Sequence, residues 1–81
     1  MNNPITDEFG NKYWYNKKEL YHREDGPAVE GADGYKAYYI NGLLHREDGP
    51  ALEYSFGCKE YWINGVKYSS LEQGLMDQAL K

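Results

Sequence analysis

The feature that most constrains this chain is an internal repeat with a fixed period. The seven residues HREDGPA occur twice, unchanged, at residues 22–28 and 45–51. Around them, residues 22–44 align without a gap with residues 45–67, and fourteen of the 23 positions are identical. A partial copy precedes them, because GNKYWYN at residues 10–16 matches GYKAYYIN and GCKEYWIN with one residue missing. A fixed period of this length predicts an array of stacked structural units.

Each unit carries two chain reversals, which predict β-hairpins. Asn41-Gly42 and Asn64-Gly65 lie between β-prone residues, and Asn-Gly is the strongest short signal for a type I′ hairpin turn. The first unit has the lysine-bearing stretch 16–19 at this place, so we predict a longer and looser loop there. A second reversal carries the glycine of DEFGNK, EGADGYK and EYSFGCK. Strands are predicted near residues 4–8, 12–16, 28–31, 35–40, 43–45, 51–55, 58–63 and 66–68.

The fold class predicted from these hairpins is mainly β: an antiparallel meander of repeated β-hairpins with a 23-residue period and a short C-terminal capping helix. A length of 81 residues allows one domain, residues 1–81. Within it, residues 10–68 are predicted to form the hairpin repeats and residues 69–81 the helix.

The C-terminal segment SSLEQGLMDQALK begins with a capping box, made by Ser69 with Glu72 or by Ser70 with Gln73. Its apolar residues cluster on one side of a helix. We favour a helix that covers the last open edge or face of the sheet, and the alternative is that the apolar side docks on a partner or on a second copy. The apolar residues are Leu71, Leu75, Met76, Ala79 and Leu80.

Alternation along the strands places aromatic residues on both faces of the predicted sheet. Taken as equivalent positions, Trp14, Tyr39 and Trp62 are expected to line one face. The opposite face is expected to carry Tyr13, Tyr15, Tyr38, Ile40, Tyr61 and Ile63.

The HREDGPA segment has a chemical and a structural interpretation. His22 with Asp25 has the residue types of an acid–base pair, and the two histidines with Asp25 and Asp48 have those of a metal site. However, His22 and His45 lie one repeat apart and do not converge on one ion, so neither a metal site nor a cofactor is predicted. Glu-Asp-Gly-Pro is turn chemistry, and an arginine beside two carboxylates can clamp a corner. We favour the structural interpretation.

Composition narrows the classes of partner. The net charge of −4 argues against general binding to nucleic-acid phosphates, which requires a surplus of lysine and arginine. A single cysteine, Cys58, permits no internal disulfide and fits a reducing compartment. The sequence shows neither a signal peptide nor an apolar run of about 20 residues. We therefore expect a soluble cytoplasmic protein with no membrane association, located in the host cytoplasm if it is phage-encoded.

The unit YYINGLLHREDGPALEYSFGCKEYWING resembles the hairpin repeats of the MORN type, in a variant found in small bacterial, phage and viral proteins. The resemblance covers about residues 10–68. It implies a string of antiparallel hairpins and, for function, an interaction platform. Some repeats of this type are proposed to touch lipids, but this chain is acidic and lacks a basic stripe.

Together these features predict a small non-enzymatic protein-binding module, such as a phage-encoded inhibitor of a host defence protein. A homo-oligomer is left open. The alternative function is a small-ligand or nucleotide-binding sponge. The partner-binding residues predicted are Trp14, Tyr39, Trp62, Arg23, Arg46, Asp25 and Asp48, and the ligand-binding residues of the alternative are His22, His45, Tyr38 and Tyr61.

Overall fold

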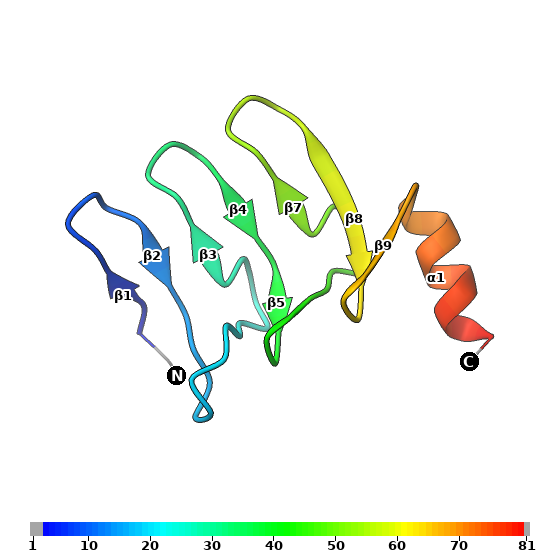
Figure 1. The fold of residues 1–81 in the computed structure, drawn as a ribbon, viewed down its shortest axis with the longest axis horizontal. Coiled ribbons are helices and arrows are strands. Elements are labelled where there is room, and N and C mark those ends of the chain that lie inside the picture. Colours follow the sequence, from blue (N-terminus) through cyan, green and yellow to red (C-terminus); the bar gives the residue numbers. More distant parts are fainter. Residues whose placement is uncertain (1–2, 81) are drawn as a thin grey trace.

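The computed structural model describes residues 3–80, which form a row of hairpins ending in one helix (Figure 1). Seven strands make one antiparallel sheet in the order β1-β2-β3-β4-β7-β8-β9, and β5 pairs with β6 in a separate short ladder. The predicted fold class, a mainly β hairpin meander with a C-terminal helix, is confirmed. The elements are β1 (Ile5–Thr6), β2 (Lys12–Tyr13), β3 (Val29–Glu30), β4 (Lys36–Ala37), β5 (Tyr39–Ile40), β6 (Leu43–Leu44), β7 (Leu52–Glu53), β8 (Lys59–Ile63), β9 (Val66–Tyr68) and α1 (Leu71–Ala79).

The predicted strand near residues 35–40 is divided at Tyr38 into β4 and β5. The two halves have different partners, because β4 pairs with β3 and β7 whereas β5 pairs with β6. Each unit therefore consists of an upper hairpin and a lower hairpin, and their turns lie at the top and bottom of Figure 1.

The three upper turns share one geometry, in which three residues lie between the two residues that close the turn by a hydrogen bond, and the last of the three is a glycine. In the second unit, Gly34 donates its N–H to the Gly31 carbonyl, and the Gly31 N–H donates to the carbonyl of Tyr35. Gly34 has a φ of 101°, a left-handed conformation that glycine adopts without a steric penalty. The lower turns of the last two units have positive φ at both Asn and Gly, which confirms the type I′ turns.

The first lower turn, between Tyr15 and Tyr21, is longer than its counterparts, as predicted. The Asn16 N–H donates to the Leu20 carbonyl across three loop residues. The Asn16 side chain also accepts the N–H groups of Lys18 and Leu20, which holds the loop closed instead of leaving it loose. The left-handed position falls on Glu19, with a φ of 63°.

In the alignment of residues 10–16 with the later copies, the one-residue gap falls after Tyr15, and this corrects the predicted faces. The Trp14 N–H donates to the Ala28 carbonyl, and in the next unit the Tyr38 N–H donates to the Ala51 carbonyl in the same way. Trp14 is therefore equivalent to Tyr38, not to Tyr39. The prediction that Trp14 shares a face with Tyr39 and Trp62 is wrong, because the gap was expected before this position and in fact follows Tyr15.

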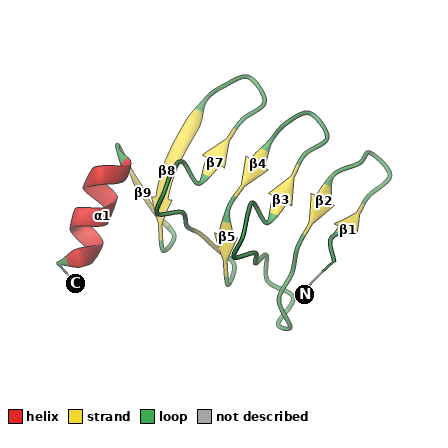
Figure 2. Cartoon of the chain, turned by 180° about the vertical axis from the view of Figure 1, so that it is seen from behind, coloured by secondary structure: helices red, strands yellow, loops and turns green. Residues whose placement is uncertain are grey.

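The sheet is a single layer with two different faces. One face carries buried Val29, Ala37 and Leu52 beneath aromatic side chains. The opposite face, here called the corner face, is crossed by the HREDGPA segments, under which Ala28 and Ala51 are fully buried. Figure 2 shows these segments as loops that connect each lower hairpin to the next upper one.

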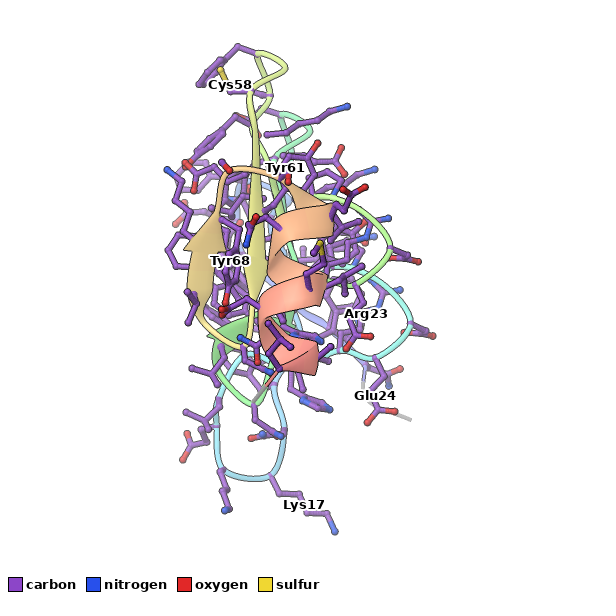
Figure 3. All side chains as sticks on the ribbon, turned by 90° about the vertical axis from the view of Figure 1, so that its right-hand side faces the viewer. Lys17, Arg23, Glu24, Cys58, Tyr61 and Tyr68 are labelled. Atoms are coloured by element: carbon purple, nitrogen blue, oxygen red, sulfur yellow. The ribbon has the colours of Figure 1, made fainter. Side chains whose placement is uncertain are left out.

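Helix α1 packs on the corner face at the end of the array, on the same side of the sheet as Arg23 (Figure 3). Ser70 is its N-cap and accepts the Gln73 N–H, which confirms the capping start at Ser70. Gly74 faces the sheet so closely that an added Cβ would lie 2.9 Å from side-chain atoms of Ile63 and of Tyr68. A glycine is thus what lets the helix reach the strands.

The orientation of α1 differs from the prediction. Most of its predicted apolar side does not cover the sheet, since Leu75, Met76 and Leu80 are exposed. Instead, Gly74 lies against β8 and β9, and Asp77 and Gln78 bind the hydroxyl group of Tyr68.

We expect Glu19→Gly to stabilise the protein by about 1 kcal/mol, because it removes a left-handed conformation from a residue with a Cβ. Denaturant unfolding would measure the change. Lys18→Gly is the matched control, since Lys18 lies in the same loop without a positive φ, and it should leave stability unchanged or lower it. Equal gains from the two variants would contradict strain at Glu19.

Candidate functional site

Each HREDGPA corner is closed by its arginine. The Arg23 Nε donates to Asp25 Oδ1 at 3.0 Å. Its Nη1 donates to the Pro27 carbonyl at 3.1 Å and to Glu30 Oε2 at 2.9 Å. The guanidinium group lies 3.9 Å above the centre of the Trp14 ring. One side chain therefore holds both ends of the corner and fixes the corner onto the sheet.

The second corner repeats this geometry. Arg46 donates to Asp48 at 2.9 Å, to the Pro50 carbonyl at 3.1 Å and to Glu53 at 3.2 Å. It lies 4.0 Å above the ring of Tyr38. Only 23% of either arginine side chain is exposed, so both guanidinium groups are largely committed within the fold.

The corner histidines connect successive lower hairpins. The Nδ1 atom of His45 accepts the backbone N–H of Asn64 at 2.9 Å, and its Nε2 lies 3.0 Å from Glu47. His22 accepts the N–H of Asn41 in the same manner. Because Nδ1 accepts a hydrogen bond, the neutral imidazole carries its proton on Nε2. Each histidine thus secures the type I′ turn of the next lower hairpin.

The two corners lie next to each other and enclose a groove of about 420 Å³. Its arginines are bound internally, and its exposed rim is formed by carboxylates. No group of three His, Cys, Asp or Glu side chains within residues 3–80 could hold a metal ion. The groove is lined by Arg23, Glu24, Asp25, Gly26, Tyr38, Ile40, His45, Arg46, Glu47 and Asp48.

A ladder of alternating charge crosses the upper sheet on the corner face, and sequence reasoning missed it. Register pairs Lys12 with Glu30, Glu30 with Lys36, Lys36 with Glu53, and Glu53 with Lys59. Directly opposite residues of opposite charge stabilise antiparallel strands. The signal was present in the repeat, where both Glu and Lys are among the identical positions.

The other side of the sheet carries seven half-buried aromatic side chains, and we call it the tyrosine face. The rings of Tyr15 and Tyr21 lie 5.1 Å apart, as do those of Tyr21 and Tyr39. Helix α1, the only helix within residues 3–80, lies on the opposite side of the sheet. The tyrosine face consists of Tyr13, Tyr15, Tyr21, Tyr35, Tyr39, Tyr54 and Trp62.

The carboxylates on the tyrosine face are bound by its own residues. Glu60 accepts the Trp62 Nε1–H at 2.9 Å and the Tyr54 hydroxyl at 3.2 Å, and Lys67 Nζ lies 3.7 Å away. The hydrogen bond from Trp62 lowers the pKa of Glu60. At the other end, Asp7 accepts hydrogen bonds from neighbouring groups, which lower its pKa as well.

The structure separates the predicted site residues instead of gathering them. Trp14 is buried beneath Arg23, and Tyr38 lies beneath Arg46. Asp25 and Asp48 are exposed at the corners, with 74% and 86% of their side chains accessible. The tyrosine face holds Tyr39 and Trp62, whereas the corner face holds Trp14, Arg23, Arg46, His22, His45, Tyr38 and Tyr61.

A scan against protein-family models, a search of curated proteins and a search of solved structures each found no match. The resemblance to MORN-type repeats therefore stays a prediction. No helix in the described part of the chain is long and apolar enough to cross a membrane.

We expect Arg46→Lys to destabilise the protein by about 1–3 kcal/mol, because lysine cannot reproduce the charged hydrogen bonds of the guanidinium fork. Denaturant unfolding would measure this loss. Asp48→Asn is the control, since it removes one exposed ion pair, worth less than about 1 kcal/mol. Equal losses in the two variants would show that the clamp does not hold the corner.

Stability should fall at alkaline pH because burial raises the pKa values of Tyr21 and Tyr35 above the ordinary 10.0. A raised pKa in the folded state means that the stabilisation is complete below pH 10 and is lost as the pH rises through the higher folded values. Unfolding midpoints between pH 8 and 12, about the tyrosine range, would measure the loss. Tyr35→Phe should weaken this dependence, and an unchanged slope would contradict it.

Proposed function

We propose that this chain is a non-enzymatic protein-binding module and that the tyrosine face is its binding surface. The observation that carries the proposal is a sheet face with seven half-buried aromatic side chains, opposite the face on which α1 packs. Tyrosine and tryptophan are enriched among the residues that dominate the energy of protein interfaces. In the setting predicted from the sequence, the partner would be a host protein.

The chemistry of the corners supports a structural role for HREDGPA over a catalytic one. Each arginine donates hydrogen bonds to two carboxylates and a carbonyl, and each histidine accepts a backbone N–H. A general base needs a free lone pair in reach of a substrate, and the Nδ1 atoms of His22 and His45 are occupied.

The nucleotide-sponge alternative receives less support from the same contacts. Phosphate recognition needs arginine donors aimed at the ligand. In the groove, Arg23 and Arg46 are paired with carboxylates of the fold, and the exposed charges are those of Glu24, Asp25, Glu47 and Asp48, so a phosphate would meet a negative rim.

The proposal predicts that a partner captured by the wild type is lost when the aromatic rings of the tyrosine face are truncated. The test variant is Tyr39→Ala with Trp62→Ala, and immobilised protein would be exposed to host lysate with the bound proteins identified by mass spectrometry. We expect capture to fall at least about tenfold, in line with the loss of two interface hot spots.

The matched control is Met76→Ala with Leu80→Ala, which removes exposed apolar surface from α1 instead. Circular dichroism establishes that each variant is folded. Capture that survives the tyrosine-face change but fails in the helix variant would move the binding surface to α1 and overturn the proposal.

A further inference from the structure

The tyrosine face lacks the second layer that a sheet normally packs against. Domains are generally built from two packed layers of secondary structure around one core. Within residues 3–80 the corner face is covered by the HREDGPA corners and α1, whereas the tyrosine face is covered only by its own side chains. The molecule is accordingly thin, with a shortest extent of 16 Å.

The tyrosine face can be removed from water without stranding a charge. Glu60 is bound by Trp62, Tyr54 and Lys67, and Asp7 is bound by Asn11 and Tyr13. Burying an unpaired charge would cost several kcal/mol, whereas these carboxylates already have partners. The corner face is unlike this, because its exposed carboxylates would meet like charges in a second copy.

The breadth of the molecule leaves room for a stable interface on the tyrosine face. Across its two longer axes the whole molecule, α1 included, extends over 41 × 31 Å. A standard protein interface buries about 800 Å² on each partner. Two such sheets pack about 10 Å apart with their strands nearly aligned, so the rings of the two faces would interdigitate.

We propose that two copies of this chain associate tyrosine face to tyrosine face, forming a two-layer β-sandwich dimer. This inference rests on the proposed function, in which the same face is the binding surface, and names a second copy as its occupant when no other partner is bound. We favour a second copy as the occupant, because its tyrosine face has the same dimensions and its carboxylates Glu60 and Asp7 already have partners, so it brings no unpaired carboxylate to the contact. Another protein would then bind by displacing it.

The test is sedimentation equilibrium over a range of concentrations. We expect the wild type to approach twice the monomer mass of 9.4 kDa. Tyr39→Arg would place a charge in the interface of both copies and should raise the dissociation constant at least about tenfold. Met76→Arg, on the exposed side of α1, is the control and should leave the constant unchanged.

A second measurement needs no substitution. Cys58 is the only cysteine and is exposed, so it can carry a nitroxide spin label. When labelled protein is mixed with isotope-labelled protein, the ring signals of Tyr13, Tyr21 and Tyr39 in the second copy should broaden.

A wild type that stays monomeric at all concentrations, with no broadening between copies, would overturn the dimer. A dimer that Met76→Arg dissociates and Tyr39→Arg does not would also overturn it, by placing the contact on α1. Either result leaves the proposed function to its own test, because loss of lysate capture in the Tyr39 and Trp62 variant does not depend on self-association.

Discussion

The stacking of each corner arginine on an aromatic ring of the hairpin that precedes it is the interaction on which this structure depends. A single-layer sheet of short strands has little apolar surface to bury, and few two-residue strands would persist alone. The Arg23 guanidinium covers Trp14, while its donors close the loop that passes over fully buried Ala28. The corner thereby provides a second layer on one side of the sheet without any additional secondary structure.

The same logic explains how the array ends. Tyr68 pairs with Tyr61 where His45 bonds to Tyr38 one unit earlier, so it takes the place of a corner histidine. It has no HREDGPA segment after it, and α1 lies there instead. The Tyr68 hydroxyl donates to Asp77 at 2.6 Å and accepts from Gln78. The helix is therefore attached by polar contacts and one close-packed glycine, and Leu75, Met76 and Leu80 remain exposed.

The sequence predicted those parts of the fold that depend on local chemistry. The turn at Asn41-Gly42 needs two positive φ values, which this residue pair adopts readily. The fixed period then gives the position of the equivalent turn in the next repeat. The face of Trp14 could not be predicted, because a one-residue gap can lie on either side of it and alternation reverses with the choice. The orientation of α1 was equally inaccessible, since it depends on a hydroxyl of Tyr68 that only the packed structure brings near.

The candidate site follows a related division between the two faces. On the corner face, the charged side chains of the repeat pair with one another. Conspicuous residues such as Arg46 and His45 form hydrogen bonds within the fold. On the tyrosine face, the repeat leaves rings that stack on each other, with Glu60 held by Trp62. An aromatic surface whose carboxylates, Glu60 and Asp7, already have partners loses less when water leaves it than a surface with unpaired charges. That asymmetry, more than the duplicated motif itself, is the physical reason to seek the partner on the aromatic side.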